Sequence, residues 1–132
     1  MAPTQQPGAD PRTGLLMLAP YISRLTAAPK LQGDAHLKEL NDTFVHEATQ
    51  LEQAAPTANL HPVMLTGASL LLAIQQKAYP SLAAPAQALL RQAQALPGRN
   101  ETPAEQTRNN QFLQQESALF KQLLALTPGT HP

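Results

Sequence analysis

Four prolines interrupt an alanine-, leucine- and glutamine-rich pattern in the second half of the chain: Pro80, Pro85, Pro97 and Pro103. Proline fixes its own φ, lacks an N–H and biases the preceding residue away from the α region, so it suits the first turn of a helix and opposes the interior. The spacing of these prolines therefore predicts several separate helices. We expect an all-α fold, a compact four- to five-helix bundle with a flexible, proline-rich N-terminal tail.

Composition supports this fold class. The β-branched residues valine and isoleucine, which strands draw on heavily, occur only as Ile22, Val45, Val63 and Ile74. The chain has no cysteine, which excludes a disulfide framework, a cysteine zinc site and a thiol nucleophile. Its length of 132 residues can hold one hydrophobic core. We expect a flexible tail over residues 1–11, a single helical-bundle domain over 12–127 and a flexible C-terminus over 128–132.

The charges balance but are unevenly spread. Nine basic and nine acidic side chains give a net charge of zero, so no overall field attracts nucleic acid or an anionic membrane, and self-association is weakly opposed. Residues 34–55 carry five acids against Lys38, whereas residues 56–100 carry Lys77, Arg91 and Arg99 with no acid. One interpretation is a basic region that faces an acidic helix. The other is chance variation in a chain with few charges.

Neither a membrane span nor a cleaved signal is expected. The longest apolar stretch, residues 63–74, is interrupted by polar residues and falls short of the ~20 residues that cross a bilayer. The apolar run over residues 14–19 follows Arg12 as a signal sequence would, but it is short and Pro20 ends it. We expect a cytoplasmic protein with no membrane contact.

Two helices are predicted in the first half. One covers residues 12–27, with Pro20 on its solvent side, and the next begins after Asp34 as N-cap and ends at Pro56. On the polar side of the second, Asp42 and His46 are four residues apart, a spacing at which both could ligate one divalent ion. Two ligands cannot close a structural site and no second half-site is evident, so we assign no metal.

The third predicted helix begins at His61, with Pro62 in its first turn, and only a narrow polar strip interrupts its apolar surface. Such a helix either lies at the centre of the bundle or offers a surface to a partner. Gly67 costs roughly 1 kcal/mol relative to alanine inside a helix. The small residues 67–69 would let another helix cross close to the backbone, which gives a packing reason for this glycine.

Two further helices are predicted. One covers residues 82–96, with Pro85 in or near its first turn, and Pro97-Gly98 ends it. The sequence Thr102-Pro103-Ala104-Glu105 has the pattern of a capping box and opens a last helix that reaches Leu126. Residues 105–111 are polar all round, so we expect that half to project beyond the bundle. Four polar side chains there could contact a phosphate backbone: Arg99, Arg108, Asn109 and Asn110.

Glu116 lies where the last helix should be most apolar, four residues after Phe112 and three before Leu119. Three arrangements could accommodate a carboxylate at this position. It could lie at an open edge of the bundle, pair with a cation such as Arg24 or Lys77, or line a pocket as a neutral acid with a raised pKa. The sequence leaves all three open.

No glycine-rich phosphate loop, HExxH or GxSxG motif occurs, so we assign no catalytic residue and no cofactor. The excess of apolar helix surface favours a non-catalytic protein–protein interaction or assembly module that binds itself or a helical partner. The alternative is a small-ligand or proton-transfer bundle built on Glu116, and a nucleic-acid-associated regulator ranks third. The candidate contact residues are Val63, Leu65, Leu70, Leu72, Phe112 and Phe120.

Overall fold

The computed structural model describes residues 11–28, 31–55 and 58–126, and these residues form helices and loops without a strand. The α-helices and one short 3₁₀ helix (η2) are α1 (Pro11–Thr26), α2 (Ala35–Glu52), α3 (His61–Ala78), η2 (Pro80–Leu82), α4 (Ala83–Ala95) and α5 (Pro103–Ala125). The predicted all-α bundle is confirmed. Both predicted tails lie outside the described residues, except for Pro11, which begins α1.

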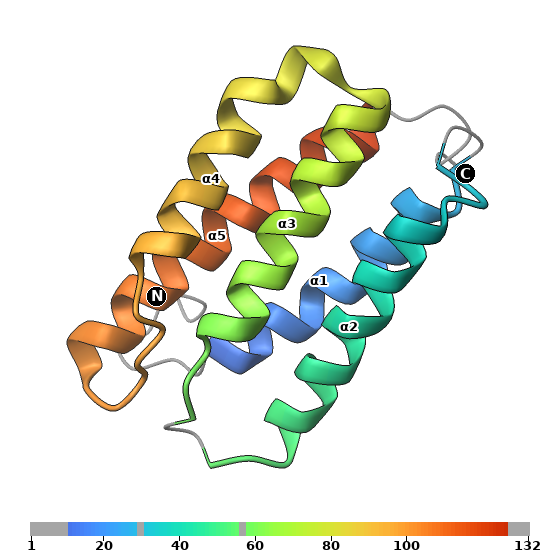
Figure 1. Cartoon of the computed structure of the whole chain (residues 1–132). Helices are drawn as coiled ribbons and strands as arrows, with labels where there is room; N and C mark the ends of the chain where they lie inside the picture. Colours follow the sequence, from blue (N-terminus) through green and yellow to red (C-terminus); the bar gives the residue numbers. More distant parts are fainter. Residues whose placement is uncertain (1–10, 29–30, 56–57, 127–132) are drawn as a thin grey trace, which may run out of the picture.

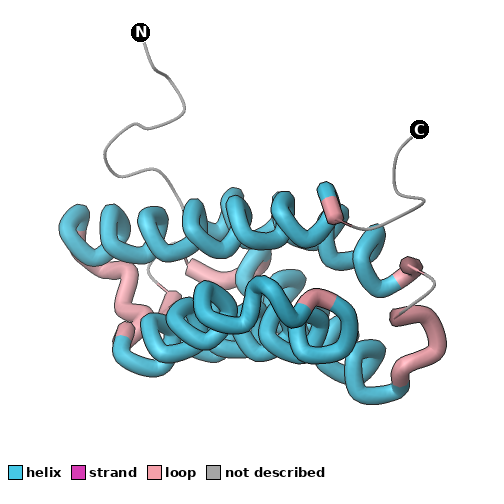
Figure 2. Tube along the Cα trace, turned by 90° about the horizontal axis from the view of Figure 1, so that it is seen from above, coloured by secondary structure: helices cyan, strands magenta, loops and turns pink. Residues whose placement is uncertain are grey.

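The helices form two layers. Helices α2, α3 and α4 lie side by side with α3 in the middle, and α1 and α5 cover them from behind (Figure 1). The view from above shows the same separation between the layers (Figure 2). Helix α3 packs against α2, α4 and α5, while α1 packs mainly against α5. Of the two positions that the sequence left open for the third helix, the structure shows the central one for the contacts within this chain.

Capping groups fix where α2 and α5 begin. The Leu37 backbone N–H donates to Oδ1 of Asp34 at 3.0 Å, which satisfies one of the free N–H groups of the first turn of α2. At α5, the Thr102 hydroxyl accepts from the N–H of Glu105, and the Glu105 carboxylate accepts from the N–H of Thr102. Both predicted caps are confirmed. Helix α2 ends at Glu52, before the predicted end at Pro56.

Gly98, in the loop after α4, packs against the start of α3. Its φ is +76°, as expected for a glycine after a helix, and its carbonyl accepts from the Leu60 N–H at 2.8 Å. A Cβ at residue 98 would collide with the His61 backbone. Nδ1 of His61 in turn lies 2.8 Å from the Leu96 carbonyl. The loop after α4 is thus held against the N-terminus of α3.

The first half of α5 does not project beyond the bundle, so this prediction is wrong. Asn109 is only 2% exposed, and its amide donates to the Arg99 carbonyl at 2.9 Å and to Oδ1 of Asn100 at 3.1 Å. These bonds hold the start of α5 to the loop after α4. Asn109 is therefore not available to a phosphate backbone, whereas Arg99 and Arg108 are exposed.

Candidate functional site

Glu116 lies at the centre of the buried face of α5 and has no exposed surface. Arg24 is exposed, and Lys77 instead pairs with Asp34 at 2.7 Å. Of the three arrangements open from the sequence, an open edge and an ion pair are therefore both wrong. Among the residues that the structure describes, neither carboxyl oxygen of Glu116 has a hydrogen-bond partner.

Gly67 of α3 provides the space that the Glu116 side chain occupies. A Cβ placed at residue 67 would lie 3.0 Å and 3.1 Å from the two carboxyl oxygens, closer than side-chain atoms ordinarily pack. The small residue was predicted to admit a neighbouring helix. The structure shows that it admits a carboxyl group.

Burial raises the pKa of Glu116 well above its ordinary value, because the charged form loses its hydration and gains no partner. The group is therefore an acid whose neutral form the fold favours. None of the hollows described below includes Glu116 in its lining. Of the third arrangement, the burial and the raised pKa are found, but Glu116 is packed against a helix backbone and does not line these hollows.

A hollow of about 180 Å³ lies between the C-terminal half of α2 and the N-terminal end of α3. Its polar lining includes Glu47. Oε1 of Glu47 is covered by neighbouring atoms and has no hydrogen-bond partner within the described part of the chain. The apolar lining comes from both helices, with Leu51 on α2 and Val63 on α3. The hollow thus combines apolar walls with one unsatisfied acceptor.

Two shallower hollows of about 330 and 250 Å³ lie between α4 and α5. Both include Gln92 and Gln115, and the only charged side chain in their lining is Arg108. The remaining lining is uncharged and consists of glutamine, alanine and leucine side chains together with Pro85 and Phe112. This surface has no group suited to acid–base chemistry or metal binding.

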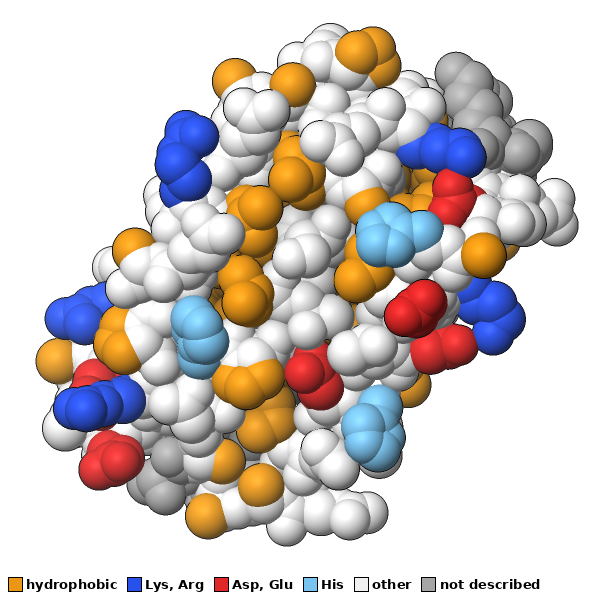
Figure 3. All heavy atoms as spheres, in the orientation of Figure 1, with side chains coloured by type: hydrophobic (Ala, Val, Ile, Leu, Met, Phe, Trp, Pro, Cys, Tyr) orange, Lys and Arg blue, Asp and Glu red, His pale blue; other side chains and the backbone are white. Residues whose placement is uncertain are grey.

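One strip along the outer side of α3 carries no charge, because Lys77, the charged residue of this helix, lies beside it at the C-terminal end. We call this surface the α3 face and define it as Leu65, Ser69, Leu72, Ala73 and Gln76. The two leucines and Ala73 are half-buried against the core, and Ser69 lies between them on the helix surface. Apolar side chains form a broken row along the middle of this side of the molecule, and most charged side chains lie at its two flanks (Figure 3).

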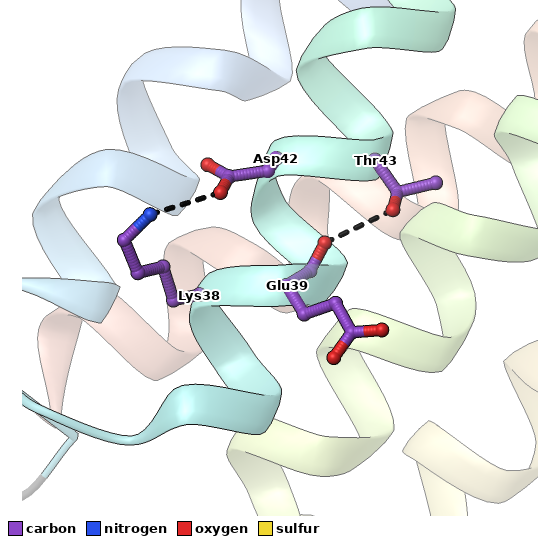
Figure 4. A network of polar contacts seen from close by, with 4 residues as sticks. All are labelled: Lys38, Glu39, Asp42 and Thr43. Atoms are coloured by element: carbon purple, nitrogen blue, oxygen red, sulfur yellow. Dashed lines mark hydrogen bonds and ion pairs between the residues drawn. The ribbon is translucent and has the colours of Figure 1, made fainter.

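The α2 flank is acidic. Lys38 pairs with Asp42 at 3.0 Å, while the Glu39 side chain points away from that pair and only its backbone carbonyl accepts, from Thr43 (Figure 4). Asp42 and His46 are not joined by a third ligand, since no group of three or more potential metal-ligating side chains occurs among the described residues. Among the described residues, neither Glu39 nor Glu47 forms an ion pair.

The structure divides the six predicted contact residues into two groups. Leu65 and Leu72 remain half-buried on the α3 face. The other four point into the core and are covered by this chain itself: Val63, Leu70, Phe112 and Phe120. The helical spacing placed all six apolar residues on helix faces. The sequence does not specify which side of α3 the other helices cover. Glu47 was missed as a site residue because an acid on a polar helix face gives no signal of its own.

Neither a protein-family model, nor a curated protein, nor a solved structure matches this chain. Within the described residues, no helix is both long and apolar enough to cross a membrane.

Proposed function

We propose that this chain is a non-catalytic assembly module that pairs with a second copy of itself through the α3 face. The observation that carries the proposal is an uncharged, partly apolar helix surface at the middle of a three-helix layer. Its central residues Ser69 and Ala73 are small, so two copies of α3 can approach closely, while Leu65 and Leu72 supply apolar contact area.

The charges beside the face select the orientation of the second copy. Glu39 and Glu47 lie on α2, whereas residues 83–100 contain Arg91 and Arg99 and no acid. A two-fold axis parallel to α3 in the plane of contact places α2 of each copy over α4 of the other, so acids meet bases. An axis perpendicular to α3 in that plane would place α2 over α2. The uneven charge noted in the sequence thus favours a parallel pair.

Sedimentation over a hundredfold range of concentration tests the proposal. We expect the wild-type mass to rise from 14.2 kDa toward twice that value. Ser69→Arg should hold the protein as a monomer, because it places two like charges at the centre of the contact. Ser23→Arg is the matched control, since Ser23 is exposed on α1 in the other layer and should leave pairing intact.

A wild-type mass fixed at 14.2 kDa over the whole range would contradict self-assembly. Equal loss of pairing in both serine variants would also contradict the proposed surface. Circular dichroism of each variant shows whether the helices persist.

Proton transfer or small-ligand binding at Glu116 is the second candidate function. Its support is the buried, unpartnered carboxyl group, a feature that functional sites share. Because the hollows between the helices do not reach this group, a ligand would require α5 to move away from α3. The direct test is isothermal titration of a small cationic probe, ethylamine, into the wild type and Glu116→Gln. Equal heats of binding for the wild type and Glu116→Gln would contradict a ligand-binding role for Glu116.

A further inference from the structure

The hollow between α2 and α3 has the chemistry of a receptor for a basic side chain. A covered acceptor without a donor is costly, and a cationic donor satisfies such an oxygen with a strong, charge-assisted bond. Oε1 of Glu47 is such an acceptor. The apolar walls formed by Leu51, Pro62 and Val63 suit the methylene stem of a long basic side chain, whose charged end then meets the carboxylate.

The proposed pairing brings one arginine to this hollow. In the parallel arrangement, α4 of the second copy lies over α2, and Arg91 is the only charged residue of α4. Arg91 is exposed, and no ion pair joins it to another described residue. It is therefore free to enter a neighbouring copy.

Glu47 of one copy and Arg91 of the other lie at similar levels along the axis of α3 in the parallel arrangement. Asp34 before α2 bonds to Lys77 near the end of α3, and Leu96 after α4 bonds to His61 at the start of α3. At 1.5 Å per residue, Glu47 lies about 20 Å below the level of Lys77, and Arg91 lies about 8 Å above the level of His61. Helix α3 spans about 24 Å between those levels, so the two groups differ in height by only about 4 Å.

We propose that the α2–α3 hollow binds the guanidinium group of Arg91 from a second copy of this chain, with Glu47 as its acceptor. The proposal rests on the self-assembly proposed above. In a symmetric pair the contact forms twice, so each dimer holds two arginines in two hollows. Arginine suits the site better than lysine because its planar group presents several donors at once.

A double-mutant cycle measured by sedimentation tests the pairing. Glu47→Gln and Arg91→Gln should each weaken self-association by about tenfold or more, since each removes one partner of two symmetric charge-assisted bonds. The double variant should be no weaker than the weaker single variant. The matched controls are Glu52→Gln, exposed on the same helix but outside the hollow, and Arg108→Gln on α5. Neither control should change the dissociation constant by more than about twofold.

A second measurement tests the hollow without self-association. In the Ser69→Arg variant, titration with N-acetyl-arginine methylamide should produce saturable NMR shifts of the Leu51 and Val63 methyl groups. The uncharged analogue N-acetyl-norleucine methylamide should not, and Glu47→Gln in the same background should abolish the arginine response.

The outcomes separate the two proposals. Wild-type pairing that is unchanged by Glu47→Gln overturns the role of the hollow and leaves self-assembly standing. A wild type that stays monomeric overturns self-assembly and the assignment of Arg91, and a saturable arginine response would then identify the hollow as a guanidinium site for another protein. No response and no weakening together overturn the inference entirely.

Discussion

At the scale of single residues, Glu116 makes the stability of the fold depend on pH. Its pKa is raised in the folded chain by burial, so the folded state holds a proton that the unfolded state releases near the ordinary carboxyl pKa. The contribution of the neutral group is fully present below that ordinary pKa. It is lost as the pH rises toward the raised value.

We therefore expect the free energy of unfolding of the wild type to fall by as much as about 1.4 kcal/mol per pH unit over part of the range above the ordinary carboxyl pKa. Glu116→Gln should remove that slope. Urea unfolding at intervals of half a pH unit measures the difference, and Glu52→Gln on the exposed side of α2 is the control. Parallel curves for the wild type and Glu116→Gln would contradict the buried neutral acid.

Gly67 and Glu116 should be energetically coupled. Alanine at residue 67 gains roughly 1 kcal/mol of helix propensity but crowds the carboxyl oxygens, so Gly67→Ala should destabilise the wild type. In the Glu116→Ala background the crowding disappears and the same change should stabilise. Denaturant unfolding of the four proteins gives the coupling energy, which we expect to exceed about 1 kcal/mol. Additive effects would show that the two side chains do not share this space.

At the scale of helices and loops, the two glycines with positive φ provide a matched comparison. Gly33 has φ +85° and open space around its Cβ position, so Gly33→Ala should cost only the backbone strain of about 1 kcal/mol. At Gly98 an alanine would have the same backbone strain, and its Cβ would also collide with the His61 backbone. Gly98→Ala should be clearly more destabilising by thermal unfolding. Equal decreases in the melting temperature of the two variants would mean that the loop after α4 moves freely away from α3.

The capping box of α5 can be tested separately from its core. Thr102→Ala should cost about 1 kcal/mol, with hydrogen exchange accelerated in the first turn of α5, because the N–H of Glu105 loses its acceptor. Thr107→Ala, exposed in the same helix, is the control. Unchanged exchange at Glu105 would contradict the role of the cap.

Elements that depend on neighbours in sequence could be predicted, and those that depend on distant segments could not. The caps at Asp34 and Thr102 and the helix start at His61 follow from groups within four residues. Asn109 was misjudged because its acceptors lie in a loop whose position is set by tertiary packing. Glu116 was identified as anomalous, but its contact with Gly67 depends on which faces of α3 and α5 meet, and sequence periodicity does not specify that pairing.

At the scale of the whole molecule, self-assembly links stability to concentration. A dimer that forms only from folded chains raises the melting temperature as protein concentration increases. We expect that rise for the wild type and for Ser23→Arg, and a constant melting temperature for Ser69→Arg. Calorimetry at several concentrations measures it, and a concentration-independent wild type would contradict the paired state.

The packing of α1 against α5 also sets an order of events during folding. Helices α2, α3 and α4 meet partners that are adjacent in the chain, so their contacts close short loops. The main partner of α1 is the last helix, and closing so long a loop carries a larger entropic cost. Helix α1 can pack against α2 early, but during synthesis the part of its apolar side that meets α5 stays uncovered until α5 has left the ribosome. That interval is when a nascent chain of this protein would most need a chaperone.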